Sequence, residues 1–221
     1  MLKITNEVLE QYAQKVKNDP KYGSENKLID QALKENPLNT NISTVAMKIC
    51  LIDLTNRTNL SRNLGTEDGL YKLSDTIVKS NFADKIVKSN FDERVKNGDL
   101  TLVSELSEWT KKEIGKNLFS FISKYCLYHN VHCYDRDDYA IFDSVLSQNL
   151  GKYIDEKDYK KITGKTLFKN SFEKMRKESD YSQYMKIIDH IIKQNNITVD
   201  KPRRKLDWFI WYKNKNNEKD A

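Results

Sequence analysis

Two residues that could form a reactive pair stand nineteen positions apart in the sequence, Lys124 and Asp143. Lys124 lies in an apolar stretch, and Asp143 directly precedes another one, at a position where aspartate is a favoured helix N-cap. A neutral lysine amine is a nucleophile that can form a Schiff base, and a carboxylate beside it can accept a proton or stabilise a developing positive charge. The same residues also fit a solvated lysine and an ordinary N-cap, so the tertiary fold must decide between these interpretations.

The elements that position this pair are predicted to be helices. Apolar residues recur at helical spacing over residues 118–128, and Val145 and Leu146 begin another such face. Of the 221 residues only 38% are hydrophobic, while seven Gly and three Pro are too few for the many turns of a sandwich or barrel. Residues 45–54 are apolar nearly all round and are expected to form a central buried helix. The sequence therefore predicts an all-α fold.

The charge balance favours a polyanionic partner. A formal net charge of +6 attracts nucleic acid or an anionic membrane surface, although a solvated lysine-rich surface gives the same value. Three cysteines at uneven spacing do not form a disulfide framework and indicate a reducing compartment. The N-terminus lacks the apolar run of a signal peptide, and no stretch has the length of a membrane span. We expect a cytoplasmic protein without membrane contact; the sequence carries no signal for its oligomeric state.

A cluster of cysteine and histidine competes for the segment that contains Lys124. Cys126 and His129 lie three positions apart, as a zinc-chelating pair on a helix would. His132 and Cys133 are adjacent, however, and a thiol on an apolar face behaves as a small hydrophobe, which favours a packing role. No phosphate-binding glycine loop, metalloprotease motif or nucleophile elbow is present. We expect no metal and no small-molecule cofactor, with zinc binding by these four residues as the alternative.

Aromatic residues gather near the C-terminus, after a basic run. They could form a stacking platform for bases with a basic collar, or they could pack into the core. Leu206, Phe209 and Ile210 follow helical spacing, which favours the core interpretation. The aromatic residues are Trp208, Phe209, Trp211 and Tyr212.

The segment 118–146 resembles the helix-hairpin-helix DNA glycosylase superfamily, which includes endonuclease III and 8-oxoguanine glycosylase-like enzymes. In its bifunctional members a lysine opens an apolar helix, and an aspartate caps the next helix eighteen or nineteen residues later, as Lys124 and Asp143 do here. Residues 46–53, followed by polar residues, look like that family's buried helix at the nucleotide pocket. In order and spacing the resemblance covers about residues 40–150.

The resemblance implies base excision from DNA with abasic-site lyase activity. Lys124 would be the amine nucleophile, and Asp143 would stabilise the oxocarbenium-like charge and act as general base. The target base must leave the stack, which requires plug residues and a basic footprint. The candidate DNA-binding residues are Asn56, Arg57, Asn59, Lys112, Lys116 and Asn117.

The resemblance also implies a two-lobed helical fold with a cleft between the lobes. The cleft would be lined by residues near 55–60 and 120–145. The predicted parts of the single unit 1–221 are a central lobe over 40–150 with a hairpin-like region at 115–143, a second lobe from 1–39 and 151–215, and a disordered tail at 214–221.

The sequence departs from the family pattern at the hairpin. Family members carry a Leu-Pro-Gly-hydrophobic-Gly turn that holds a phosphate, whereas residues 118–122 read Leu-Phe-Ser-Phe-Ile. Gly115 is the nearest glycine, and the iron–sulfur cysteines of some members are absent. A non-catalytic helical module that binds nucleic acid or a protein on the same scaffold is therefore the alternative function.

Overall fold

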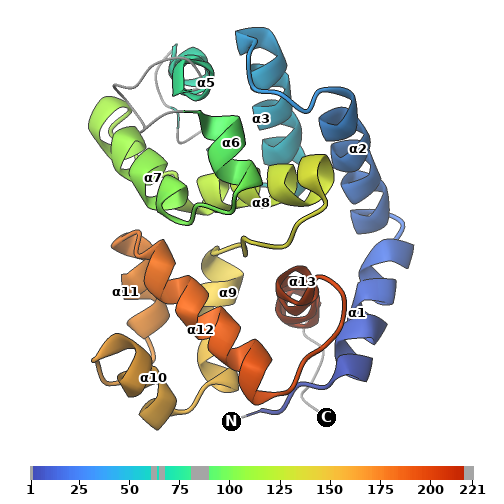
Figure 1. The fold of residues 1–221 in the computed structure, drawn as a ribbon, viewed down its shortest axis with the longest axis vertical. Helices are drawn as coiled ribbons and strands as arrows, with labels where there is room; N and C mark the ends of the chain where they lie inside the picture. The colour runs from blue at the N-terminus through green and yellow to red at the C-terminus, as the bar shows by residue number, and fades with distance from the viewer. Residues whose placement is uncertain (1, 61–63, 65–67, 81–89, 217–221) are drawn as a thin grey trace.

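The computed structural model describes residues 2–60, 64, 68–80 and 90–216. Every regular element in these residues is a helix, which confirms the all-α class (Figure 1). The described helices include no segment with the length and apolarity of a membrane span. In chain order the elements are α1 (Asn6–Asn18), α2 (Tyr22–Glu35), α3 (Ile42–Asn56), α5 (Gly69–Ser80), α6 (Phe91–Lys96), α7 (Thr101–Glu113), α8 (Phe119–Tyr134), α9 (Ser144–Asn149), the 3-10 helix η1 (Leu150–Tyr153), α10 (Glu156–Thr163), α11 (Ser171–Lys177), α12 (Tyr181–Gln194) and α13 (Pro202–Lys215).

Several helices begin at a polar N-cap side chain. Thr5, Asn41 and Asp143 each accept a backbone N–H from the first turn of α1, α3 and α9 respectively. These caps satisfy amide donors that have no partner within the helix. A cap depends only on the two or three residues that follow it, and the predicted cap at Asp143 is confirmed.

Helix α8 crosses the middle of the molecule, and α2, α3, α6 and α7 pack against it (Figure 1). Helix α13 lies between α1 and α9 and also contacts α12 (Figure 1). Two helices contact elements on the other side of the predicted boundaries between the lobe 40–150 and the lobe made of 1–39 and 151–215. Helix α2 packs on α3 and α8, and α9 packs on α11 and α13. A helix joins whichever neighbours cover its apolar face, so a turn in the sequence does not by itself mark a structural boundary.

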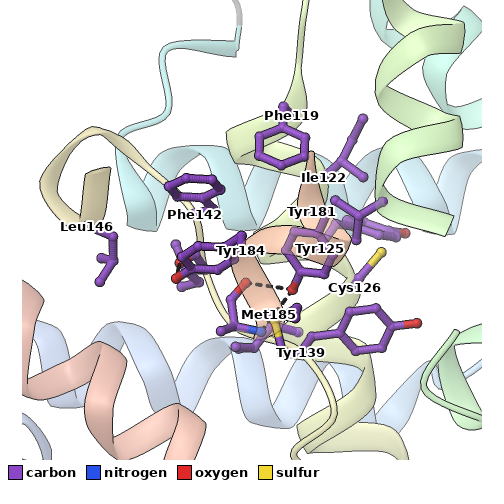
Figure 2. Close-up of a cluster of buried hydrophobic side chains, with 14 of the residues drawn as sticks. Phe119, Ile122, Tyr125, Cys126, Tyr139, Phe142, Leu146, Tyr181, Tyr184 and Met185 are labelled. Carbon is purple, nitrogen blue, oxygen red and sulfur yellow. Dashed lines mark hydrogen bonds between the residues drawn. The ribbon is translucent and has the colours of Figure 1, made fainter. Parts of the chain in front are cut away.

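An aromatic cluster holds the chain that leads from α8 to α9 (Figure 2). The rings of Phe142 and Tyr184 are stacked, with centroids 3.8 Å apart. The Tyr181 hydroxyl donates to the carbonyl of Ala140 at 2.7 Å and accepts from its amide at 2.9 Å. The Tyr184 hydroxyl donates to the Ile141 carbonyl at 2.5 Å. This extended segment is therefore fixed by side chains of α12, directly before the N-cap of α9.

Helix α3 is less buried than its composition predicted. Val45, Ile49 and Ile52 are fully buried, but Leu54 is 78% exposed and Met47 is 45% exposed. The expectation of a helix buried all round is wrong, because the described residues leave Leu54 and Met47 uncovered.

Helix α13 continues to Lys215, so it includes the first two residues of the predicted tail at 214–221. Residues 217–221 lie outside the described part of the chain. The aromatic residues of α13 divide between two environments. Phe209 is buried in the core, whereas Trp208 and Trp211 are half-buried and line a pocket.

Candidate functional site

Lys124 and Asp143 meet in the interior of the protein. The Nζ atom of Lys124 lies 3.0 Å from Oδ2 of Asp143 and donates a hydrogen bond to it. Their side chains are only 7% and 10% exposed. Lys124 stands in the second turn of α8, and Asp143 is the N-cap of α9. The fold therefore brings together the two residues that the sequence proposed as a reactive pair.

Local hydrogen bonds fix both partners of the pair. Oδ1 of Asp143 accepts from the amides of Val145 and Leu146 at 3.0 and 3.1 Å, which leaves Oδ2 for Lys124. Ser123, beside Lys124 on α8, accepts from the Phe142 amide at 3.2 Å. Each carboxylate oxygen of Asp143 thus has its own partner, and α8 is tied to the chain directly before this residue.

The surroundings keep Asp143 ionised. Burial raises the pKa of its carboxyl, but the Lys124 ammonium and the amides of Leu146 and Val145 outweigh burial, and the net pKa lies below its usual value. In this state the pair consists of an ammonium and a carboxylate in contact, so that a proton could pass from nitrogen to oxygen over one hydrogen bond.

The pair lies where two pockets meet. Lys124, Asp143 and Asn56 line both of them. One pocket, named here the Trp208 pocket, has about 530 Å³ of space outside protein atoms, including open solvent. The other, named the Arg57 pocket, is larger, with about 1170 Å³ on the same measure. Lys124 is therefore part of the lining that a ligand would meet in either pocket.

One face of α13 forms a wall of the Trp208 pocket. Arg204, Asp207, Trp208 and Trp211 recur every three or four positions and all line it. The guanidinium of Arg204 lies 4.7 Å from the ring centroid of Trp208 and 5.0 Å from that of Tyr128. The sequence pointed to the two tryptophans, with Arg204 in the basic collar before them, but not to Asp207. The three-to-four spacing of polar and aromatic residues, beside an apolar face, was the signal that could have found Asp207.

The carboxyl of Asp207 differs from that of Asp143. It is 5% exposed, and Oδ2 accepts from Arg204 at 3.1 Å. Among the described residues, Oδ1 has no hydrogen-bond partner. Burial raises the pKa of Asp207 to about 7, and the Arg204 guanidinium offsets only part of that effect.

Four of the six predicted DNA-binding residues lie at the site. Asn56, Arg57, Asn59 and Asn117 line the Arg57 pocket. The backbones of Arg57 and Asn59 adopt left-handed φ angles of 52° and 53°. Such conformations are uncommon for residues with a Cβ atom and are often found at functional sites.

The other two predicted DNA-binding residues, Lys112 and Lys116, do not line either pocket. Both are exposed, and the Nζ atom of Lys112 lies 3.6 Å from the carboxylate of Glu113. The basic side chains of Arg176 and Lys215, which sequence analysis did not select, line the Arg57 pocket instead. They come from α11 and α13, so only the tertiary fold places them beside α3 and α8.

The alternative zinc site of Cys126, His129, His132 and Cys133 is not formed. Among the described residues, no three Cys, His, Asp or Glu side chains are grouped as metal ligands would be. Cys126 and Cys133 are separated by two helical turns, about 10.5 Å along the axis. His132 Nδ1 instead lies 2.7 Å from Oδ1 of Asp30, and His129 Nδ1 hydrogen-bonds a backbone carbonyl of its own helix at 2.9 Å.

The comparison with known protein families gives a match over most of the N-terminal part of the chain. The family model HI_0787_N, described as an N-terminal domain, matches residues 8–133, more than half of the 221 residues. The chain belongs to this family. The HI_0787_N match includes Lys124 but ends before Asp143 and α13, so both the matched region and the residues after it build the site. No curated protein and no solved structure matches the chain.

Proposed function

We propose that this protein excises bases from DNA through the amine of Lys124 and also cleaves the strand at the resulting abasic site. The observation that carries the proposal is the 3.0 Å contact between Lys124 Nζ and Asp143 Oδ2 at the junction of the two pockets. The same proposal includes a relationship to the helix-hairpin-helix DNA glycosylases. It also includes DNA binding in a cleft between two lobes.

The chemistry begins with a proton transfer from the Lys124 ammonium to the Asp143 carboxylate. The free amine then forms a bond to C1′ of the nucleotide, while the glycosidic C–N bond breaks and the base leaves with the electron pair and takes up a proton. Opening of the sugar ring gives an iminium between Lys124 and C1′. Loss of a C2′ proton then expels the 3′ phosphate and breaks the strand. The proton that the departing base takes up comes from Asp143, which is thereby ionised again and would stabilise the positive charge on the sugar as the glycosidic bond breaks.

The surroundings of the Lys124–Asp143 pair suit a nucleotide that has left the DNA double helix. Arg57, Arg176 and Lys215 line the larger pocket, where their side chains could contact phosphates. Arg176 also pairs with Glu173 at 2.8 Å, so a phosphate would compete with that carboxylate. The Trp208 pocket offers aromatic side chains on which an extruded base could stack.

A non-catalytic module that binds nucleic acid is the second candidate. It is favoured by the hydrogen bonding of Asp143, whose oxygens are all used in capping α9 and pairing with Lys124. A buried pair of this kind can be purely structural.

Borohydride trapping separates the two candidates. The purified protein is mixed with duplexes that carry an abasic site or a damaged base, and sodium borohydride reduces any iminium to a stable amine. We expect a covalent protein–DNA adduct that is absent in Lys124→Gln and reduced in Asp143→Asn. Lys186→Gln, which changes an exposed lysine of α12, is the matched control and should form adduct at the wild-type level.

Salt-dependent DNA binding without an adduct on any duplex would exclude the lyase chemistry and favour the non-catalytic module. An adduct that persists in Lys124→Gln would show that another amine reacts. Peptide mapping of the adduct would then identify that residue.

A further inference from the structure

The Trp208 pocket contains a hydrogen-bonding atom that the protein itself leaves unused. Oδ1 of Asp207 has no partner among the described residues, although the side chain is 95% buried and lines the pocket. The large majority of buried side-chain polar atoms in folded proteins are hydrogen-bonded, and each exception needs a reason. A ligand in this pocket would supply the missing partner.

Arg204 holds the Asp207 carboxyl in one orientation. Its guanidinium donates to Oδ2 of Asp207 at 3.1 Å and to Oδ1 of Asn26 at 3.1 Å. Contacts with the rings of Tyr128 and Trp208 fix the plane of the guanidinium. Because Oδ2 is bound to a side chain that is itself immobilised, Oδ1 is the carboxyl oxygen left without a partner; it is itself covered, so a ligand must settle closely against Asp207 to reach it.

The other residues of the pocket indicate what kind of ligand fits. Tyr22, Tyr128, Trp208 and Trp211 line it, and their rings offer flat apolar surfaces. A flat aromatic ligand with one hydrogen-bond donor at its edge would stack on these rings and place the donor against Asp207.

We propose that the Trp208 pocket binds a planar nitrogen heterocycle and that Oδ1 of Asp207 accepts a hydrogen bond from a ring N–H of this ligand, so that Asp207 determines which bases the site selects. This inference rests on the proposed function, in which the heterocycle is the base next to Lys124. It adds a specificity-determining residue, outside the Lys124–Asp143 pair, that belongs to a different helix.

The substitution Asp207→Asn gives a sharp test because Arg204 controls how the new amide is oriented. The guanidinium has only donors, so it would bind the carbonyl oxygen of the asparagine. The amide –NH₂ would then take the position of Oδ1. The pocket atom changes from an acceptor to a donor with almost no change in shape, and the preferred ligand should change with it.

Two free heterocycles of nearly equal shape measure this preference. 9-Methylhypoxanthine carries a ring N–H, whereas 6-methoxy-9-methylpurine has an unprotonated nitrogen at that position and no N–H at all. Their dissociation constants would be measured by ligand-observed NMR at pH 8 with Lys124→Gln, so that no chemistry is required. We expect 9-methylhypoxanthine to bind about tenfold or more tightly, as for a hydrogen bond to a charged group.

When Asp207→Asn is added to the Lys124→Gln protein, 6-methoxy-9-methylpurine should become the tighter ligand. Asp189→Asn is the matched control, because Asp189 pairs with neighbouring Arg203 at 2.7 Å but is half exposed and lines no pocket at the site. This variant should keep the original preference. Trp208→Leu should weaken both ligands by about tenfold through loss of stacking and keep their ratio.

Equal affinity for the two probes, no binding of either, or an unchanged preference in Asp207→Asn would overturn the inference. These outcomes are independent of the trapping experiment. An adduct without probe selectivity would remove only the role of Asp207, and probe selectivity without an adduct would remove only the lyase chemistry.

Discussion

Two buried aspartates line the same pocket and differ in nearly every other respect. Asp143 accepts hydrogen bonds from Lys124 and from two amides at the start of α9, and its pKa lies below the usual value. Asp207 accepts from Arg204 alone, and burial raises its pKa to about 7. Both side chains are at most 10% exposed, so exposure does not explain the difference.

The number of hydrogen-bond donors around each carboxyl explains the difference in pKa between the two aspartates. Removing a carboxylate from water disfavours its charged form, and only hydrogen bonds and opposite charges can compensate. Asp143 has this compensation for both oxygens, whereas Asp207 has it for one. Paired acids whose pKa values are pushed apart are typical of sites that assign different roles to chemically identical groups.

The largest effect is expected from Asp143→Ala. It removes the N-cap of α9 and leaves the Lys124 ammonium buried without its partner, which should lower the free energy of unfolding by about 3–5 kcal/mol. Asp155→Ala is the control, because Asp155 caps α10 in the same way without a buried lysine and should cost only about 1 kcal/mol. Urea unfolding measures both. Equal losses for the two variants would mean that the Lys124–Asp143 pair adds nothing to stability.

The substitution Asp207→Asn is expected to have a smaller, pH-dependent effect that raises the free energy of unfolding. Between the ordinary aspartate value of 3.8 and about 7, the folded protein keeps a proton on Asp207 that the unfolded chain has released. Stability from this group therefore falls as pH rises through that window. Asparagine has no such proton, so the variant should be more stable than wild type at pH 8, and the difference should shrink towards pH 4.

Parallel urea titrations of both proteins at pH 4, 6 and 8 test this slope. The two proteins must be compared at each pH because burial also raises the pKa of Asp137 to about 6. This residue makes the free energy of unfolding fall with rising pH in both proteins, and the difference between them removes its contribution. Asp143 contributes in a separate window, because its lowered pKa makes its stabilisation disappear only as the solution becomes more acidic than about 4. A difference that does not change with pH would place the Asp207 carboxyl in a solvated environment. The charged groups around Asp207 are Arg204 on α13, Lys124 on α8, Asp143 at the start of α9, Asp137 between α8 and α9, and Glu25 on α2.

The smallest effect is expected from Tyr128→Phe. The Tyr128 hydroxyl donates to Oδ1 of Asn56 at 2.9 Å, and Asn56 lines both pockets. Loss of this bond should cost about 1 kcal/mol, while the ring that contacts Arg204 remains. Tyr71→Phe changes a 59% exposed side chain and should cost nothing measurable in the same unfolding assay. The Asp207 pH dependence should be unchanged in Tyr128→Phe; a changed slope would show that Tyr128 orients Arg204 through its hydroxyl.

The sequence alone determined the features that depend on near neighbours. The helical class follows from the spacing of apolar residues and the scarcity of Gly and Pro, and the cap at Asp143 follows from an aspartate ahead of an apolar turn. The resemblance of the nineteen-residue interval between Lys124 and Asp143 to the glycosylase pattern pointed to two residues that the structure places in contact. In these cases the relevant partners are local or lie on consecutive helices.

The tertiary structure alone decided what surrounds the pair. Arg204 and Asp207 lie more than sixty positions beyond Asp143, and only the packing of α13 between α1 and α9 brings them into the pocket. Spacing along a helix shows that residues share a face but not what that face meets. The same reason explains the exposed side of α3 and the positions of Lys112 and Lys116 outside the pockets. Burial, and with it the raised pKa of Asp207, is a property of distant neighbours that local sequence does not specify.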